Sequence, residues 1–97
     1  MKIYIAGKIT GDPNYKSKFN AAHLSIVYQY DVPINPALLP AGLSKADYAR
    51  ICFAMIDTAD KVMFLPDWQE SPGARLEMEY CLYTGKDIEI LPVIPEV

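Results

Sequence analysis

The stretch KVMFLPDWQESPGARLE, residues 61–77, combines a strand, a turn and the start of a helix. After one lysine, the next four residues are all apolar, which is typical of a central strand covered on both faces. Ser71 and Pro72 then predict a helix start, because a serine hydroxyl can accept from the first free N–H groups and proline suits the first helical position. The helix is expected to run to Gly85 and Lys86.

This predicted helix carries one carboxylate on an unusual face. Its small and apolar residues recur at the helical period, at Ala74, Met78, Cys81, Leu82 and Gly85. Glu77 occupies a slot that this stripe would normally give to an apolar residue, whereas Glu79 lies on a different face beside Arg75. One interpretation is that Glu77 flanks the core and extends outward. The other is that its carboxylate is held in a cleft for chemistry.

The composition indicates a single globular domain that spans residues 1–97, with 52% hydrophobic and 22% charged residues. The net charge of −3 disfavours binding to nucleic-acid polymers or anionic membranes. No apolar run approaches the roughly 20 residues that cross a bilayer, and the N-terminus lacks a signal-peptide layout, so we expect a cytoplasmic protein. Cys52 and Cys81 are expected to be reduced and buried. With His23 as the one histidine, we expect neither a metal nor another cofactor.

The remaining chain predicts alternating strands and helices. Prolines 33 and 92 assign the second and fourth strands to sheet edges, because proline cannot donate to a ladder. Ser44 and Asp47 predict a capping box at the start of the second helix. The pattern therefore predicts a three-layer, flavodoxin- or Rossmann-like α/β fold with a four-stranded parallel sheet in the order 2-1-3-4. Strands are expected at residues 2–6, 32–35, 61–65 and 88–94, and helices at 19–30, 44–59 and 71–86.

This strand order reverses between the first and third strands, and open α/β sheets bind ligands at such a point. The loops expected there are residues 7–14 and 66–71, with residues 36–42 as a lid or wall. The first loop could wrap a phosphate, although glycine turns are common after a first strand; its candidate binding residues are Gly7, Lys8, Ile9, Thr10 and Gly11. Ser71 and Gly73 form a second candidate anion site at a helix N-terminus, for which simple capping is the alternative.

Other side chains near this point have two interpretations each. Asp67 could make a polar contact to a ligand, or could simply be a turn residue after a proline. Four aromatic residues could face a nucleobase or could pack in the core or at its rim: Tyr4, Tyr15, Phe19 and Trp68. We take Glu77, Asp67 and Tyr4 as the candidate catalytic residues.

Three segments carry a resemblance to a known family: IYIAGKITG at residues 3–11, AMIDTADKVMFLPDW at 54–68 and SPGARLEMEYCLYTGK at 71–86. In this order they resemble the nucleoside 2-deoxyribosyltransferase superfamily, which includes deoxynucleoside 5′-monophosphate N-glycosidases. Within it, the chain is most similar to a small group of bacterial and phage proteins without a settled function. The resemblance covers nearly the whole chain.

The resemblance implies a nucleoside or nucleotide substrate and specific residue roles. A glutamate nine residues before a Gly-Lys lysine attacks the anomeric carbon in the transferases, which here is Glu77 before Lys86. The glycosidase motif Gly-x-Ile-x-Gly matches residues 7, 9 and 11, and Ser-x-Gly-x-x-x-Glu matches Ser71, Gly73 and Glu77. In those enzymes the serine and glycine hold the 5′-phosphate.

The sequence also departs from this family at two positions. Cys52 stands where many members have an aspartate that handles the sugar and the leaving base; Asp57 could serve instead. Thr10 replaces a basic residue of the first loop, for which Lys8 could compensate. Two hypotheses therefore stay open: an N-glycosidase or deoxyribosyltransferase, or a catalytically silent protein that senses or sequesters a nucleotide-derived small molecule.

Self-association is a further expectation. The last helix carries a second stripe at Leu76, Tyr80 and Tyr83, predicted to face away from the sheet. A domain of this size would gain from burying that stripe, and members of the superfamily commonly complete their sites with a neighbouring subunit. We therefore expect a homodimer or a larger homo-oligomer that uses the second or third helix.

Overall fold

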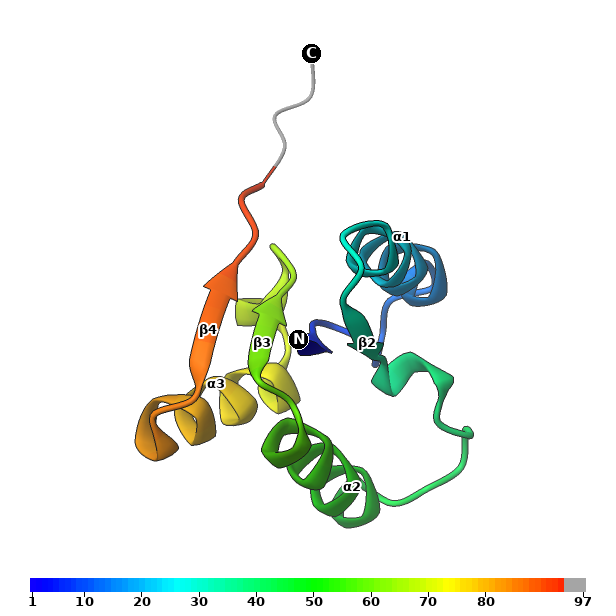
Figure 1. The fold of residues 1–97 in the computed structure, drawn as a ribbon. Helices are drawn as coiled ribbons and strands as arrows, with labels where there is room; N and C mark the ends of the chain where they lie inside the picture. The colour runs from blue at the N-terminus through cyan, green and yellow to red at the C-terminus, as the bar shows by residue number, and fades with distance from the viewer. Residues whose placement is uncertain (94–97) are drawn as a thin grey trace.

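The computed structural model describes residues 1–93 and contains one parallel, four-stranded sheet in the order β2-β1-β3-β4 (Figure 1). This order and the fold class agree with the sequence-based prediction. Both strands that were assigned to edges by their prolines lie at edges. The strands are β1 (Lys2–Ala6), β2 (Val32–Ile34), β3 (Lys61–Phe64) and β4 (Asp87–Ile90), and the helices are α1 (Tyr15–Tyr28), α2 (Lys45–Thr58) and α3 (Pro72–Thr84), with short 3-10 turns η1 (Pro36–Leu38) and η2 (Trp68–Glu70).

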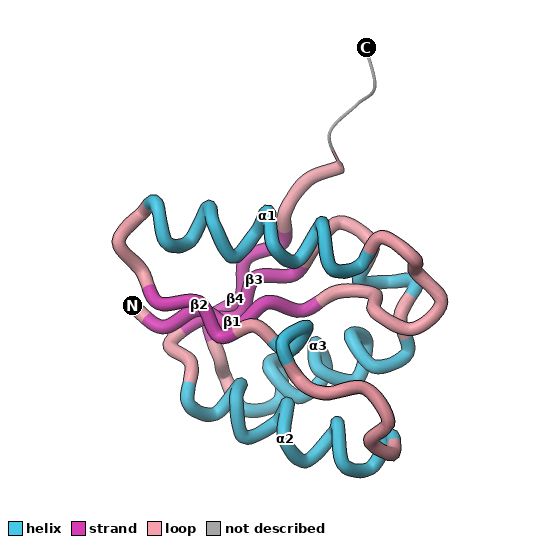
Figure 2. Tube along the Cα trace, turned by 90° about the vertical axis from the view of Figure 1, so that its right-hand side faces the viewer, coloured by secondary structure: helices cyan, strands magenta, loops and turns pink. Residues whose placement is uncertain are grey.

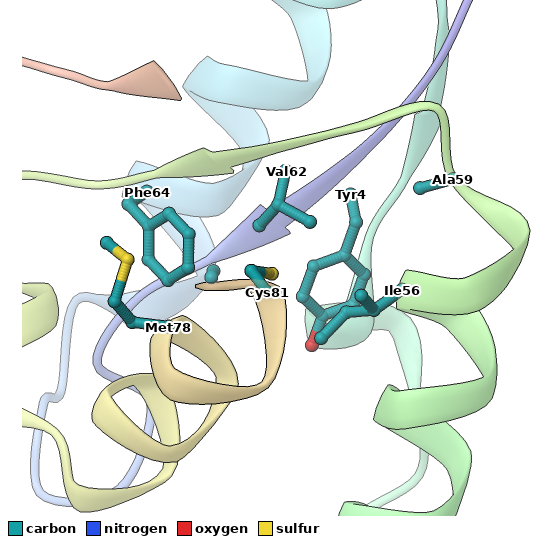
Figure 3. Packing of buried hydrophobic residues seen from close by; sticks show 8 residues of the cluster. Tyr4, Ile56, Ala59, Val62, Phe64, Met78 and Cys81 are labelled. Carbon is teal, nitrogen blue, oxygen red and sulfur yellow. The ribbon is translucent and has the colours of Figure 1, made fainter. Parts of the chain in front are cut away.

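The helices cover both faces of the sheet. Figure 2 shows α1 on one side and α2 with α3 on the other. Alternate residues of β1 follow this division: Ile3 and Ile5 pack in the core under α1, whereas Tyr4 and Ala6 pack in the core under α2 and α3. Figure 3 shows the second core, in which the Tyr4 side chain extends from β1 toward α2. The two central strands are thus buried on both faces, as their apolar sequences predict.

The helix termini follow the residues that predicted them. The Ser44 side chain accepts from the Asp47 N–H and the Asp47 side chain accepts from the Ser44 N–H, so the capping box is confirmed. Ser71 Oγ accepts from the Ala74 N–H at 3.1 Å, which caps α3. Gly85 ends α3 with a left-handed backbone (φ 75°), a conformation that glycine adopts without a steric penalty.

Some predicted boundaries were wrong. Helix α1 begins at Tyr15, four residues early, because its first turn is largely polar and gives no apolar periodicity. It ends at Tyr28, and Tyr30 has a positive φ of 63° that no helix can continue. Strand β2 ends before Asn35, whose side chain accepts from the Ala37 N–H and starts η1. Strand β4 ends at Ile90, and residue 94 of its predicted range lies outside the described residues.

Some predicted packing was also wrong. Leu82, assigned to the inner stripe of α3, is 65% exposed. Tyr80, assigned to an outer stripe, stacks on Phe53 of α2 with ring centroids 4.4 Å apart. Leu76 and Tyr83 are exposed, and self-association through this helix stays a prediction. Within residues 1–93, no helix combines the length and apolar character that crossing a membrane requires.

Candidate functional site

A cavity of about 600 Å³ opens beside the carboxyl end of β1. Five parts of the chain line it: β1 with the loop that follows, the first residue of α1, the segment between β2 and α2, the inner face of α2, and the first turns of α3. The segment between β2 and α2 was predicted to be a lid or wall, and it lines the cavity. Tyr48 connects this segment to α2, since its hydroxyl donates to the Pro40 carbonyl at 2.6 Å.

The Glu77 carboxylate lines this cavity and is held from the sheet side by Tyr4. The Tyr4 hydroxyl donates to Glu77 Oε2 at 2.5 Å. Tyr4 is only 1% exposed, and Glu77 is partly buried on α3. Burial raises the pKa of Glu77 to about 7, and the hydrogen bond from Tyr4 opposes that rise. Glu77 therefore lies in the cavity and does not extend outward from the core. Its carboxyl group titrates near neutral pH.

The ionisation of Tyr4 is suppressed in this setting. Burial raises the pKa of Tyr4 well above its usual value, and the charges of Glu77 and Cys52 raise it further. The phenol consequently keeps its proton over the physiological pH range. It acts as a fixed hydrogen-bond donor to the carboxylate rather than as a base.

Cys52 of α2 lines the same cavity and is half-buried, so it is less buried than the sequence predicted. Burial raises the pKa of the Cys52 thiol, and the nearby Glu77 charge raises it further. The thiol is therefore neutral at pH 7. Cys81, by contrast, is fully buried, and burial raises its pKa to about 11.

Both candidate anion-binding segments, residues 7–11 and 71–73, contribute to the cavity, but some residues of the first segment do not line it. Gly7, Ile9 and Thr10 line it, whereas Lys8 and Gly11 do not. Ser71 and Gly73 also line it. The Ser71 hydroxyl caps the helix, so the capping interpretation holds, and a phosphate contact stays a prediction.

Gly7 also has a packing role. A Cβ atom built on Gly7 would lie 2.8 Å from Leu65 Cδ1, closer than such atoms approach. The glycine therefore lets the end of β1 lie against the residue that follows β3.

Asp67 lies outside the cavity. Its carboxylate accepts from the Lys8 N–H at 3.1 Å and is paired with the Lys18 ammonium, which also binds Asp12. These contacts connect the loops that follow β1 and β3 with the start of α1. The structure thus gives Asp67 a role in joining loops and does not bring it next to Glu77.

Of the other side chains that the sequence singled out, some line the cavity and others lie elsewhere. Tyr15 lines the cavity. Phe19 is buried in the core under α1, and Trp68 packs edge-to-face on Phe64 with centroids 5.6 Å apart. Asp57 is exposed and accepts from the Tyr80 hydroxyl at 2.7 Å, so it does not take the place of Cys52 in the cavity.

Sequence reasoning missed two aromatic residues of the site. Tyr48 and Phe53 of α2 both line the cavity. Both fit the apolar spacing of a packing face on α2, and such spacing gives no sign that the face borders an open space. Among the described residues, no group of three His, Cys, Asp or Glu side chains is placed to hold a metal ion.

The fold is that of the 2-deoxyribosyltransferases. The solved structure of "2-desoxiribosyltransferase from Leishmania mexicana" superposes with a TM-score of 0.76 at 19% sequence identity. The match covers 96% of this chain and 65% of that chain, so this chain spans less than two thirds of the enzyme's length. At this identity the likeness establishes the fold and leaves the activity open.

The amino-acid sequence assigns the chain to a family. The family described as "Domain of unknown function (DUF4406)" matches residues 1–90, and the chain belongs to it. No curated protein sequence matches the chain.

Proposed function

We propose that the protein breaks the N-glycosidic bond of a nucleoside or nucleotide, with Glu77 as nucleophile. The released sugar passes either to water or, as a 2-deoxyribosyl group, to a second base. The observation that carries this proposal is the Glu77 carboxylate in a cavity of about 600 Å³, with one oxygen bound by the buried Tyr4 hydroxyl at 2.5 Å. A cavity of this volume accommodates a ligand of nucleoside size.

The chemistry suits a carboxylate in such a position. Breaking the bond between C1′ and the base nitrogen builds oxocarbenium character at C1′. A carboxylate can trap that carbon as a covalent glycosyl ester, which water or a second base then resolves. Because Tyr4 binds Oε2, Oε1 is the oxygen left to attack.

Substrate contacts are proposed for the two glycine segments. Gly7, Ile9, Thr10, Ser71 and Gly73 all line the cavity and would position the sugar or a 5′-phosphate. Holding C1′ against the carboxylate contributes positioning rather than chemistry. Lys8 and Asp67 lie outside the cavity and are left out of this proposal.

A second candidate function is nucleotide binding without turnover, and Cys52 favours it. Its neutral thiol lies beside Tyr4 and Glu77, where a stronger acid would be needed to protonate a departing base. Such a protein would retain the pocket and sense or sequester a nucleotide-derived molecule.

The test is incubation with nucleosides, 2′-deoxynucleosides and their 5′-monophosphates, with released base measured by chromatography. Glu77→Gln is the matched control, since it keeps the shape of the side chain and removes the charge. Base release that is lost in this variant supports the enzyme. Ligand-induced rises in melting temperature without release would support the binding protein and overturn the enzyme.

A further inference from the structure

The walls of the cavity are mainly apolar and aromatic. Tyr15, Tyr48 and Phe53 contribute partly exposed aromatic rings, whereas the ring of Tyr4 is buried, and much of the remaining surface is aliphatic. Among the described lining residues only Glu77 and Lys45 carry a charge. Lys45 is exposed at the first residue of α2, whereas Glu77 is partly buried. The inner part of the cavity therefore presents one negative charge among rings.

An isolated carboxylate in such surroundings favours a cationic ligand. Desolvation makes the ionised form of Glu77 costly, and a positive charge placed beside it would offset that cost. Aromatic rings attract cations through their faces, and the attraction is greater where water is excluded. A flat ring with a positive charge satisfies both features, because it can stack on the aromatic walls while its charge lies near the carboxylate.

We propose that the cavity selects nucleosides whose base is a cationic aromatic ring, a pyridinium or an N-alkylated purine. This inference rests on the proposed function and names the substrate class for the same site. It follows from the single carboxylate, the aromatic walls and the position of Cys52 in the cavity.

The reaction of such a substrate balances without an acid. Glu77 Oε1 forms a bond to C1′ as the bond from C1′ to the ring nitrogen breaks. The electron pair of the broken bond stays on that nitrogen, which turns the cationic ring into a neutral base. Water then attacks C1′ and the ester bond breaks, which returns the Glu77 carboxylate and releases one proton.

A neutral base, by contrast, leaves as an anion unless it receives a proton. The Cys52 thiol lines the cavity, and its pKa, raised by burial, makes it a poor source of that proton. The charge on the substrate thus does the work that an acid would otherwise do.

The experiment compares two ligands of the same shape, nicotinamide riboside (a permanent cation) and benzamide riboside (a neutral C-glycoside), each as riboside and as 2′-deoxyriboside. Binding is measured by calorimetry at pH 8, where Glu77 is ionised. We expect the cation to bind about tenfold more tightly in at least one sugar form. Glu77→Gln should abolish this preference, and Lys45→Gln, at the exposed end of α2, should increase it.

Other outcomes separate this inference from the proposed function. Equal binding of the two ligands, or binding of neither, would overturn the charge preference. If neutral nucleosides still released base in a Glu77-dependent manner, the proposed glycosidase would stand although the preference for a cationic base had been overturned. A preference for the cation, with no Glu77-dependent release of base from any of the nucleosides tested, would retain the inferred ligand class and overturn the enzyme.

Discussion

The Tyr4 hydroxyl donates to Glu77 Oε2 at 2.5 Å and connects two residues that lie 73 positions apart in the chain. Tyr4 belongs to the buried strand β1 and Glu77 to α3, so the hydrogen bond fixes the carboxylate relative to the centre of the sheet. It also stabilises the ionised carboxylate against the effect of burial. Both the position and the charge of the proposed nucleophile therefore depend on Tyr4.

The first prediction concerns the pH dependence of the proposed reaction. A nucleophilic Glu77 must be ionised, so kcat/KM should rise with pH through a pKa of about 7. Tyr4→Phe removes the hydrogen bond that lowers this pKa and retains the buried ring. We expect the rising limb to move to higher pH by about 1 unit. A limb that stays in place would show that Tyr4 does not control the ionisation of Glu77.

The second prediction concerns stability. Burial raises the pKa of Glu77 from 4.5 to about 7, so the folded protein binds more protons than the unfolded chain between these values. The stabilisation linked to this group is present below about pH 4.5 and is lost as the pH rises to about 7. Glu77→Gln should therefore be more stable than the wild type at pH 8, by about 3 kcal/mol relative to their difference at pH 4.

Urea unfolding of both proteins at pH 4 and pH 8 measures this difference. Glu79→Gln, on an exposed face of the same helix, is the matched control. Parallel pH profiles for wild type and Glu77→Gln would contradict the raised pKa.

The sequence predicted the sheet because its signals are local. Pro33 lies within β2 and excludes a central position through its missing N–H, whereas Pro92 lies beyond the end of β4, and Ser44 and Ser71 satisfy nearby backbone donors. Each effect acts within a few residues. The unusual slot of Glu77 was visible for the same reason, since helical spacing alone decides which face a residue occupies.

The partners of these residues were not predictable. Whether Tyr4 reaches Glu77 depends on how β1 and α3 pack, and a helical or strand period contains no such information. Asp67 shows the same limit. Its position after β3 was read correctly from the sequence, but the turn that follows directs its carboxylate toward Lys18 and away from the cavity.

The third prediction concerns the packing role of Gly7, with Gly73 as the comparison. Gly7→Ala would place a Cβ atom 2.8 Å from Leu65, so we expect a loss of about 1–3 kcal/mol of unfolding free energy. Gly73→Ala meets only the Ser71 hydroxyl, at 3.8 Å, and should change stability little. Chemical denaturation measures both variants. Equal losses would indicate that the contact with Leu65 does not explain Gly7.

The fourth prediction concerns Cys52 and the leaving base. In Cys52→Asp, a second carboxyl would share the cavity with Glu77, and two close carboxyls do not both ionise readily near neutral pH. The one that stays protonated can donate to a departing base. We expect release from neutral nucleosides to increase by about 10²-fold, within the range of general acid catalysis.

Two comparisons decide whether an acid causes this gain. Cys52→Ser changes the size and polarity of the side chain without supplying a proton near neutral pH, so it should leave release from neutral nucleosides nearly unchanged. Nicotinamide riboside needs no proton, so Cys52→Asp should not accelerate its cleavage. Base release from a neutral nucleoside and from nicotinamide riboside is measured for wild type and both variants. If Cys52→Asp accelerated both substrates equally, the new carboxylate would be improving the position of Glu77, and the thiol would not be what limits the reaction of neutral bases.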